Sequence, residues 1–152
     1  MKAAVNQMML CIFAIVSLLH AVDCPAQDAS ARAIVLVPRD LNWSESARAP
    51  GVHTATVTGD PSKPGPYVIR AKYPPNTVNG PHYHPADEEI TVLSGTLYFG
   101  EGLAMTLEET MTVPAGSFIA QPAKRWHFLF TKAESVELEI RGIGPRTNVF
   151  AK

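Results

Sequence analysis

Cysteine is scarce in this chain, and the little there is lies near its start. The 152 residues include two cysteines, Cys11 and Cys24. Two cysteines cannot build the disulfide framework that holds many small secreted domains together. If the first 26 residues are cleaved off, as the next features suggest, no thiol remains. That would exclude a cysteine nucleophile and a cysteine-ligated zinc site from the rest of the chain.

An excess of charge of either sign is also missing. The chain has 13 Lys and Arg against 14 Asp and Glu, a formal net charge of −1. A protein that binds nucleic acid or an anionic membrane surface usually carries a basic patch, so we expect neither partner here. A hydrophobic content of 46% with 18% charged residues indicates a folded chain, and its length fits one domain.

No hydrophobic run is long enough to span a bilayer. The longest, residues 8–19, falls short of the roughly 20 residues that a membrane-spanning helix needs. It follows Lys2 and precedes a polar region with small residues, which is typical of a secretory signal peptide. We predict a signal peptide over residues 1–26, cleaved after Ala26, and a periplasmic or secreted protein that has no membrane attachment after cleavage. An uncleaved anchor and a lipid-modified Cys24 are the alternatives.

Residues 27–152 lack the spacing of hydrophobic residues that is typical of an amphipathic helix. The whole chain also has 13 prolines, which disfavour long helices. Short β-rich segments appear instead, separated by Pro and Gly, and the clearest alternates Val136, Leu138 and Ile140 with charged residues. We expect strands near residues 34–37, 54–58, 67–73, 111–113, 117–120, 126–131 and 136–141. Residues 90–99 form a strand pair or one bent strand, with Gly95 at the turn or kink. Strands this short and this closely spaced predict an all-β sandwich or small barrel.

Histidines cluster around one such strand. His82 and His84 are two residues apart, so in a strand both side chains point to the same face. Glu88 follows after a short turn. Two imidazoles and a carboxylate leave coordination positions open and suit Fe(II), Mn(II) or Zn(II). The spacing also occurs by chance, so by itself it leaves metal binding open.

Two longer patterns resemble a known family. Residues 76–95, NTVNGPHYHPADEEITVLSG, resemble the first motif of the cupin superfamily, G(X)5HXH(X)3–4E(X)6G, with Asn76 in place of the first Gly. Residues 116–131, GSFIAQPAKRWHFLFT, resemble the second motif, G(X)5PXG(X)2H(X)3N, with Lys124 and Thr131 in place of Gly and Asn. Asparagine tolerates the positive φ of a glycine position better than most residues.

The resemblance implies a small antiparallel jelly-roll β-barrel that forms one domain over residues 27–152, with the motifs in about 66–143. It also implies a divalent metal ion, Fe, Mn or Zn, held by four side chains. These are His82, His84, Glu88 and His127. Glu88 keeps the six-residue spacing to Gly95 and is preferred to Glu89. The catalytic residues stay unknown.

The resemblance leaves the function open among several classes. One is an enzyme that oxidises or isomerises a small organic acid or carbonyl compound, with a dioxygenase-like reaction first and decarboxylation as a further class. The alternative is a non-catalytic barrel that binds a small ligand or a metal. A homodimer is common in the family, and residues 34–37 would suit such a contact. Two cations have open roles. Arg70 could bind a carboxylate substrate or face solvent, and Lys124 could attract an anionic ligand or be a solvated turn residue.

Overall fold

The computed structural model describes residues 32–46, 49–106 and 108–152, and the chain divides into two units, residues 1–34 and 35–152. The predicted signal peptide over residues 1–26 lies outside the described residues. Within the described ranges the helical structure is the short 3-10 turn η1 (Pro38–Asp40). No helix there has the length and apolar character needed to cross a membrane.

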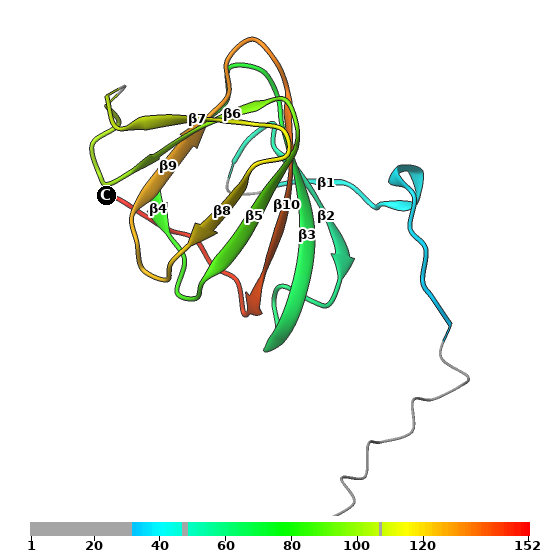
Figure 1. Cartoon of the computed structure of the whole chain (residues 1–152). Helices are drawn as coiled ribbons and strands as arrows, with labels where there is room; N and C mark the ends of the chain where they lie inside the picture. Colours follow the sequence, from blue (N-terminus) through cyan, green and yellow to red (C-terminus); the bar gives the residue numbers. More distant parts are fainter. Residues whose placement is uncertain (1–31, 47–48, 107) are drawn as a thin grey trace, which may run out of the picture. The chain divides into compact units, whose positions relative to one another are not determined.

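Two antiparallel sheets make up the unit formed by residues 35–152 (Figure 1). The first has the order β1-β2-β3-β10-β5-β8, and the second the order β11-β4-β9-β6-β7. The first sheet contains β1 (Ser44–Glu45), β2 (His53–Thr58), β3 (Gly65–Tyr73), β10 (Val136–Gly144), β5 (Glu88–Ser94) and β8 (Phe118–Gln121). The second contains β11 (Val149–Phe150), β4 (Val78–Tyr83), β9 (His127–Phe130), β6 (Thr96–Glu101) and β7 (Thr110–Pro114).

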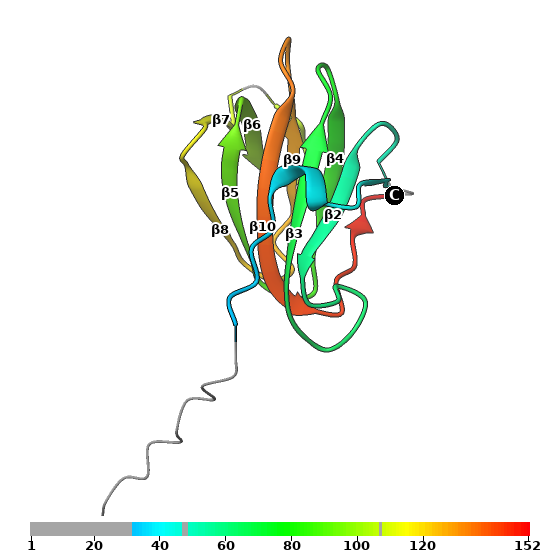
Figure 2. The same ribbon diagram turned by 90° about the vertical axis from the view of Figure 1, so that its right-hand side faces the viewer.

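The hydrophobic core lies between the two sheets, which face each other (Figure 2). Strand alternation fills it, as β10 shows: Val136, Leu138 and Ile140 are buried, and the residues between them point outward. Leu97 and Phe99 enter the core from the second sheet and are almost fully buried. The prediction of an all-β jelly roll is therefore confirmed.

Glycine 95 marks the corner where the chain leaves one sheet for the other. Of the two alternatives for residues 90–99, the strand pair is the one found, as β5 and β6 joined at this residue. Gly95 has a φ of +74°, and a Cβ atom there would collide with the carbonyl oxygen of Ser135. Only glycine meets both conditions without strain.

The strand expected at residues 34–37 is absent. Residues 32–37 form no strand, and Ile34, Val35 and Leu36 are exposed. Their β-branched composition gives a high strand propensity, but a strand also needs a hydrogen-bonded neighbour, and no pairing involves this segment. That prediction was wrong.

Candidate metal centre

Three buried histidines meet on the inner face of the second sheet. His82 near the end of β4 lies directly opposite His127, the first residue of β9, in the strand register. His84 follows His82 by two residues and shares its face. One ligand nitrogen from each ring lies within 4.8 Å of the others, so one ion could contact all three.

Each imidazole is held by a backbone carbonyl at its Nδ1 atom. The acceptors are Gly80 for His82 (2.7 Å), Thr147 for His84 (2.9 Å) and Arg125 for His127 (3.1 Å). A carbonyl oxygen only accepts hydrogen bonds, so Nδ1 must carry the proton in all three rings. The tautomer inferred from these partners leaves each Nε2 with a free lone pair, as a metal ligand requires.

Burial keeps the three rings uncharged. Loss of hydration is the main cause, and it lowers the pKa of both His82 and His84 to about 3. The pKa of His127 is lowered for the same reason. At neutral pH all three therefore offer neutral nitrogens and no proton that would compete with a cation.

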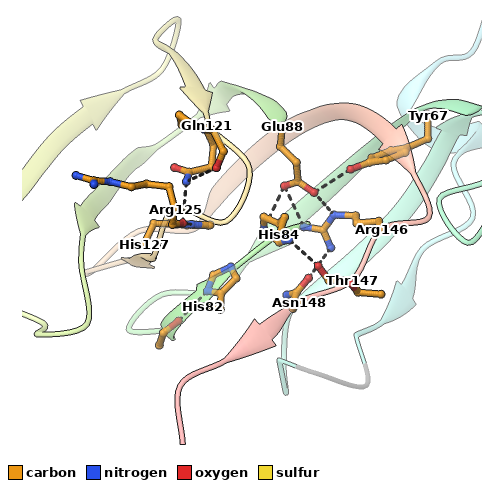
Figure 3. A network of polar contacts seen from close by, with 12 residues as sticks. Tyr67, His82, His84, Glu88, Gln121, Arg125, His127, Arg146, Thr147 and Asn148 are labelled. Atoms are coloured by element: carbon orange, nitrogen blue, oxygen red, sulfur yellow. Dashed lines mark hydrogen bonds and ion pairs between the residues drawn. The ribbon is translucent and has the colours of Figure 1, made fainter. Parts of the chain in front are cut away.

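Glu88 lies beside His84 but is not one of the three residues whose ligand atoms all lie within 4.8 Å of one another, and its two oxygens have different partners (Figure 3). Oε1 accepts hydrogen bonds from the Tyr67 hydroxyl (2.8 Å) and from Nε of Arg146 (2.7 Å). Oε2 lies 3.2 Å from Nε2 of His84 and has a longer contact, 3.4 Å, with Nη2 of Arg146. Glu88 is buried, whereas Glu89 is exposed on the other face of β5.

The two atoms that face each other between His84 and Glu88 are both hydrogen-bond acceptors. With Nδ1 protonated and the pKa of the ring lowered, Nε2 of His84 is an acceptor, and so is Oε2 of Glu88. Two acceptors 3.2 Å apart repel each other, and the Arg146 guanidinium on Glu88 offsets part of this repulsion, so a metal ion between them would stabilise the contact further. Three neutral nitrogens and one carboxylate oxygen form a donor set that suits a divalent transition metal.

The register of the first sheet brings Tyr67 and Gln121 to Glu88. Tyr67, Gly142, Glu88 and Gln121 are paired in one row across β3, β10, β5 and β8. Since Gly142 has no side chain, the Tyr67 ring reaches across it to the carboxylate. Gln121 donates through Nε2 to the carbonyl of Arg125 (3.1 Å), which also holds His127.

A segment beyond the last long strand completes the network (Figure 3). Arg146 binds Glu88 and donates to Oδ1 of Asn148 (3.2 Å), and the Thr147 carbonyl between them holds His84. Sequence reasoning missed Tyr67, Arg146 and Thr147 as site residues. The one sequence signal was a basic residue directly after the Gly-Pro break that ends β10.

The other two cations singled out from the sequence lie elsewhere. Arg70 is on the outer face of the first sheet, where it forms ion pairs with Glu137 (3.7 Å) and Glu139 (3.5 Å). Lys124 is exposed and has a φ of +59°, so it adopts the backbone conformation of the glycine that it replaces. Its amide donates to the His84 carbonyl (2.7 Å), which makes it a turn residue beside the site.

Comparison with known proteins identifies the family. The model of the cupin domain family matches residues 69–140, which contain all four predicted ligands. This chain belongs to the cupin superfamily. Asn76 of the first motif has a φ of +55°, as expected at a glycine position. Arg146 and Thr147 lie outside the matched residues.

Solved cupin structures have the same fold at low sequence identity. The polyketide cyclase RemF from Streptomyces resistomycificus is 21% identical, with a TM-score of 0.62, and the match covers 80% of this chain and 88% of that one. A sugar phosphate isomerase of the cupin superfamily from Silicibacter pomeroyi is 15% identical, with a TM-score of 0.61, and the match covers 78% of this chain and 82% of that one. At these identities the likeness shows the fold alone.

A chain from the crystal structures of the DMSP lyases RdDddP and RnDddQII is 18% identical, with a TM-score of 0.60 over 74% of the present chain. The match spans 63% of that chain's length. A search of curated proteins gives no match. The structural relatives thus carry different activities on one fold, and the function of this cupin has to be argued from its own site.

Proposed function

We propose that this cupin is an exported protein whose working site is a divalent metal ion, Fe, Mn or Zn, held by His82, His84, His127 and Glu88. The observation that carries the proposal is the group of three buried, neutral imidazoles, whose ligand nitrogens all lie within 4.8 Å of one another. A divalent cation bound by these three nitrogens would also attract Oε2 of Glu88, which lies 3.2 Å from Nε2 of His84.

The reaction we propose is oxidation or isomerisation of a small organic acid or carbonyl compound. When bound, the metal would supply Lewis acidity and, if it is iron or manganese, a redox centre. The protein's own part is to keep the donors in place. Tyr67 and Arg146 hold Oε1 of Glu88, so Oε2 is the oxygen directed toward the histidines.

Metal content tests the site. We expect the His82→Ala, His127→Ala double variant to lose at least tenfold in metal affinity, since two of four ligands are gone. The matched control is His53→Ala, because His53 is exposed at the start of β2 and belongs to no ligand cluster among the described residues. Mass spectrometry of the purified proteins gives the stoichiometry. Equal metal content in the double variant and the wild type would refute the site.

Spectra recorded with and without oxygen test the reaction class. Bound iron whose spectrum changes when O₂ is admitted together with a small organic acid or diketone would support oxidation. Stoichiometric zinc without an exchangeable water molecule would contradict any reaction at the metal and favour the non-catalytic binding barrel.

A further inference from the structure

A cavity with polar and apolar walls opens beside Arg146, and its apolar part is formed by Ala55, Pro61 and Ile69. Its volume is about 530 Å³, within the usual range of small-molecule sites. Hydroxyl and amide side chains line it together with one cation. These are Asn42, Ser44, Thr54, Thr56, Ser62 and Arg146. Glu45 is also at the wall, and its Oε1 accepts a hydrogen bond from the amide of Gly51 (2.8 Å).

The hydroxyl groups belong to the inner face of the first sheet. Thr54 pairs with Ala71 and Thr56 pairs with Ile69, two residues of the hydrophobic core, and directly paired residues share a face. Ser44 pairs with Thr54 and extends the same row to β1. Apart from the row that contains Glu88 and Gln121, the buried residues of this face are mainly apolar, so a second group of polar side chains on it favours a site that binds a polar ligand.

Arg146 is the residue that this cavity shares with the metal centre. Its amide donates to the carbonyl of Pro61 (2.7 Å), which fixes the segment against the cavity wall. Its guanidinium uses Nε and Nη2 for Glu88 and one N–H of Nη1 for Asn148. A guanidinium carries five N–H groups, and Arg146 also hydrogen-bonds the Tyr67 side chain, so at least one N–H group remains that can receive a further oxygen anion.

The charges at the site change when a metal binds. Without metal, Arg146 and Glu88 form a neutral pair beside three neutral imidazoles. A divalent cation makes the whole group doubly positive, and an anion at Arg146 then lowers the electrostatic energy. Metal and anion therefore strengthen each other's binding, and linkage requires the two effects to be equal.

We propose that the cavity binds a small hydroxylated carboxylate, with its carboxylate on Arg146 and its hydroxyl groups against Ser44, Thr54 and Thr56, and that the metal must be bound first for tight binding. This inference rests on the proposed metal centre. It names the substrate class of that site and gives Arg146 the role of recognising the anion.

Three six-carbon probes separate charge from hydroxyl recognition: gluconate has both features, hexanoate has the charge alone, and sorbitol has the hydroxyls alone. Calorimetric titration uses the full chain loaded with Zn²⁺ and the same protein without metal. We expect gluconate to bind the zinc form at least tenfold more tightly than it binds the metal-free form, and at least tenfold more tightly than the other two probes bind the zinc form.

Two sets of variants test the residues. Arg146→Gln should weaken gluconate binding at least tenfold, whereas Arg141→Gln should leave it unchanged, because Arg141 is exposed and pairs with Glu139. The Thr54→Val, Thr56→Val double variant should reduce gluconate binding to the level of hexanoate. Within the described residues, no hydrogen bond joins either threonine to a predicted metal ligand, so this variant decides the outcome if Arg146→Gln also loses zinc.

Zinc content is measured first, so that a missing metal centre is distinguished from a missing anion site. Failure of the wild type to take up zinc would refute the proposed function. If zinc is bound, two results would overturn the present inference: gluconate binding that the threonine double variant leaves unchanged, or sorbitol and hexanoate binding as tightly as gluconate.

Discussion

At the scale of single residues, the buried imidazoles make the interior of the barrel sensitive to acid. His82 and His84 have pKa values of about 3 in the folded protein because they are cut off from water. An unfolded histidine titrates near about 6.5. Between these values the unfolded chain binds more protons than the folded one, so stability falls as the pH drops from about 6.5 toward 3.

The fall in stability at acidic pH can be tested on the metal-free protein. Each such histidine lowers the free energy of unfolding by up to about 1.4 kcal/mol per pH unit within that window. Urea denaturation of protein treated with EDTA should therefore show a lower midpoint at pH 5 than at pH 7. In His82→Leu the difference between the two midpoints should shrink, and in His53→Leu, where the side chain is exposed, it should stay as in the wild type.

An equal pH dependence in His82→Leu and the wild type would contradict the burial argument. It would mean that carboxylates elsewhere in the protein account for the whole acid effect. The comparison is informative because both variants remove one histidine, and only His82 is buried.

At the scale of strands, the register across β3, β10 and β5 positions the carboxylate. Gly142 lies between Tyr67 and Glu88 in one row, and a Cβ atom there would be 2.5 Å from the Tyr67 hydroxyl oxygen and 2.9 Å from Cζ. Any side chain at residue 142 displaces the tyrosine ring from Glu88. The hydrogen bond between Tyr67 on β3 and Glu88 on β5 thus requires a glycine at residue 142 on β10.

We predict that Gly142→Ala destabilises the protein by about 1–3 kcal/mol, the usual effect of overpacking, and lowers its metal affinity. Gly80→Ala is the matched control, because a Cβ atom at Gly80 would meet nothing within 4 Å. Adding Tyr67→Phe to Gly142→Ala should recover part of the stability, since the nearest atom in the clash is removed. Urea denaturation measures both effects. A destabilisation no larger than that of Gly80→Ala would contradict the role of this row.

The same row explains which parts of the site the sequence could predict. His82, His84, Glu88 and His127 follow a spacing along the chain, and the alternation of β10 predicted its buried face. Tyr67 and Arg146 reach Glu88 only through the order of strands in the sheet, because β10 lies between β3 and β5 although it is formed much later in the chain. A pattern in the sequence does not contain that order, so neither residue was predicted.

At the scale of the whole molecule, the distribution of cysteine and hydrophobic residues fits export. Both cysteines lie within residues 1–26, next to the apolar run 8–19, and residues 27–152 contain no thiol that an oxidising compartment could modify. A metal centre built from histidine and carboxylate also needs no reduced cysteine. Export therefore stays a prediction that rests on the sequence of residues 1–26.

We predict that N-terminal sequencing of the exported protein starts at Gln27. Replacing the small residue before the cleavage point, Ala26→Arg, should block processing and leave Met1 or an uncleaved leader on the protein, because signal cleavage requires small residues there. Lys152→Arg, at the opposite end of the chain, is the control and should be processed normally. An intact Met1 on the wild-type protein would refute cleavage. A lipid attached to Cys24 would instead keep the barrel at the membrane. The proposed hydroxylated carboxylate would then have to bind the protein there.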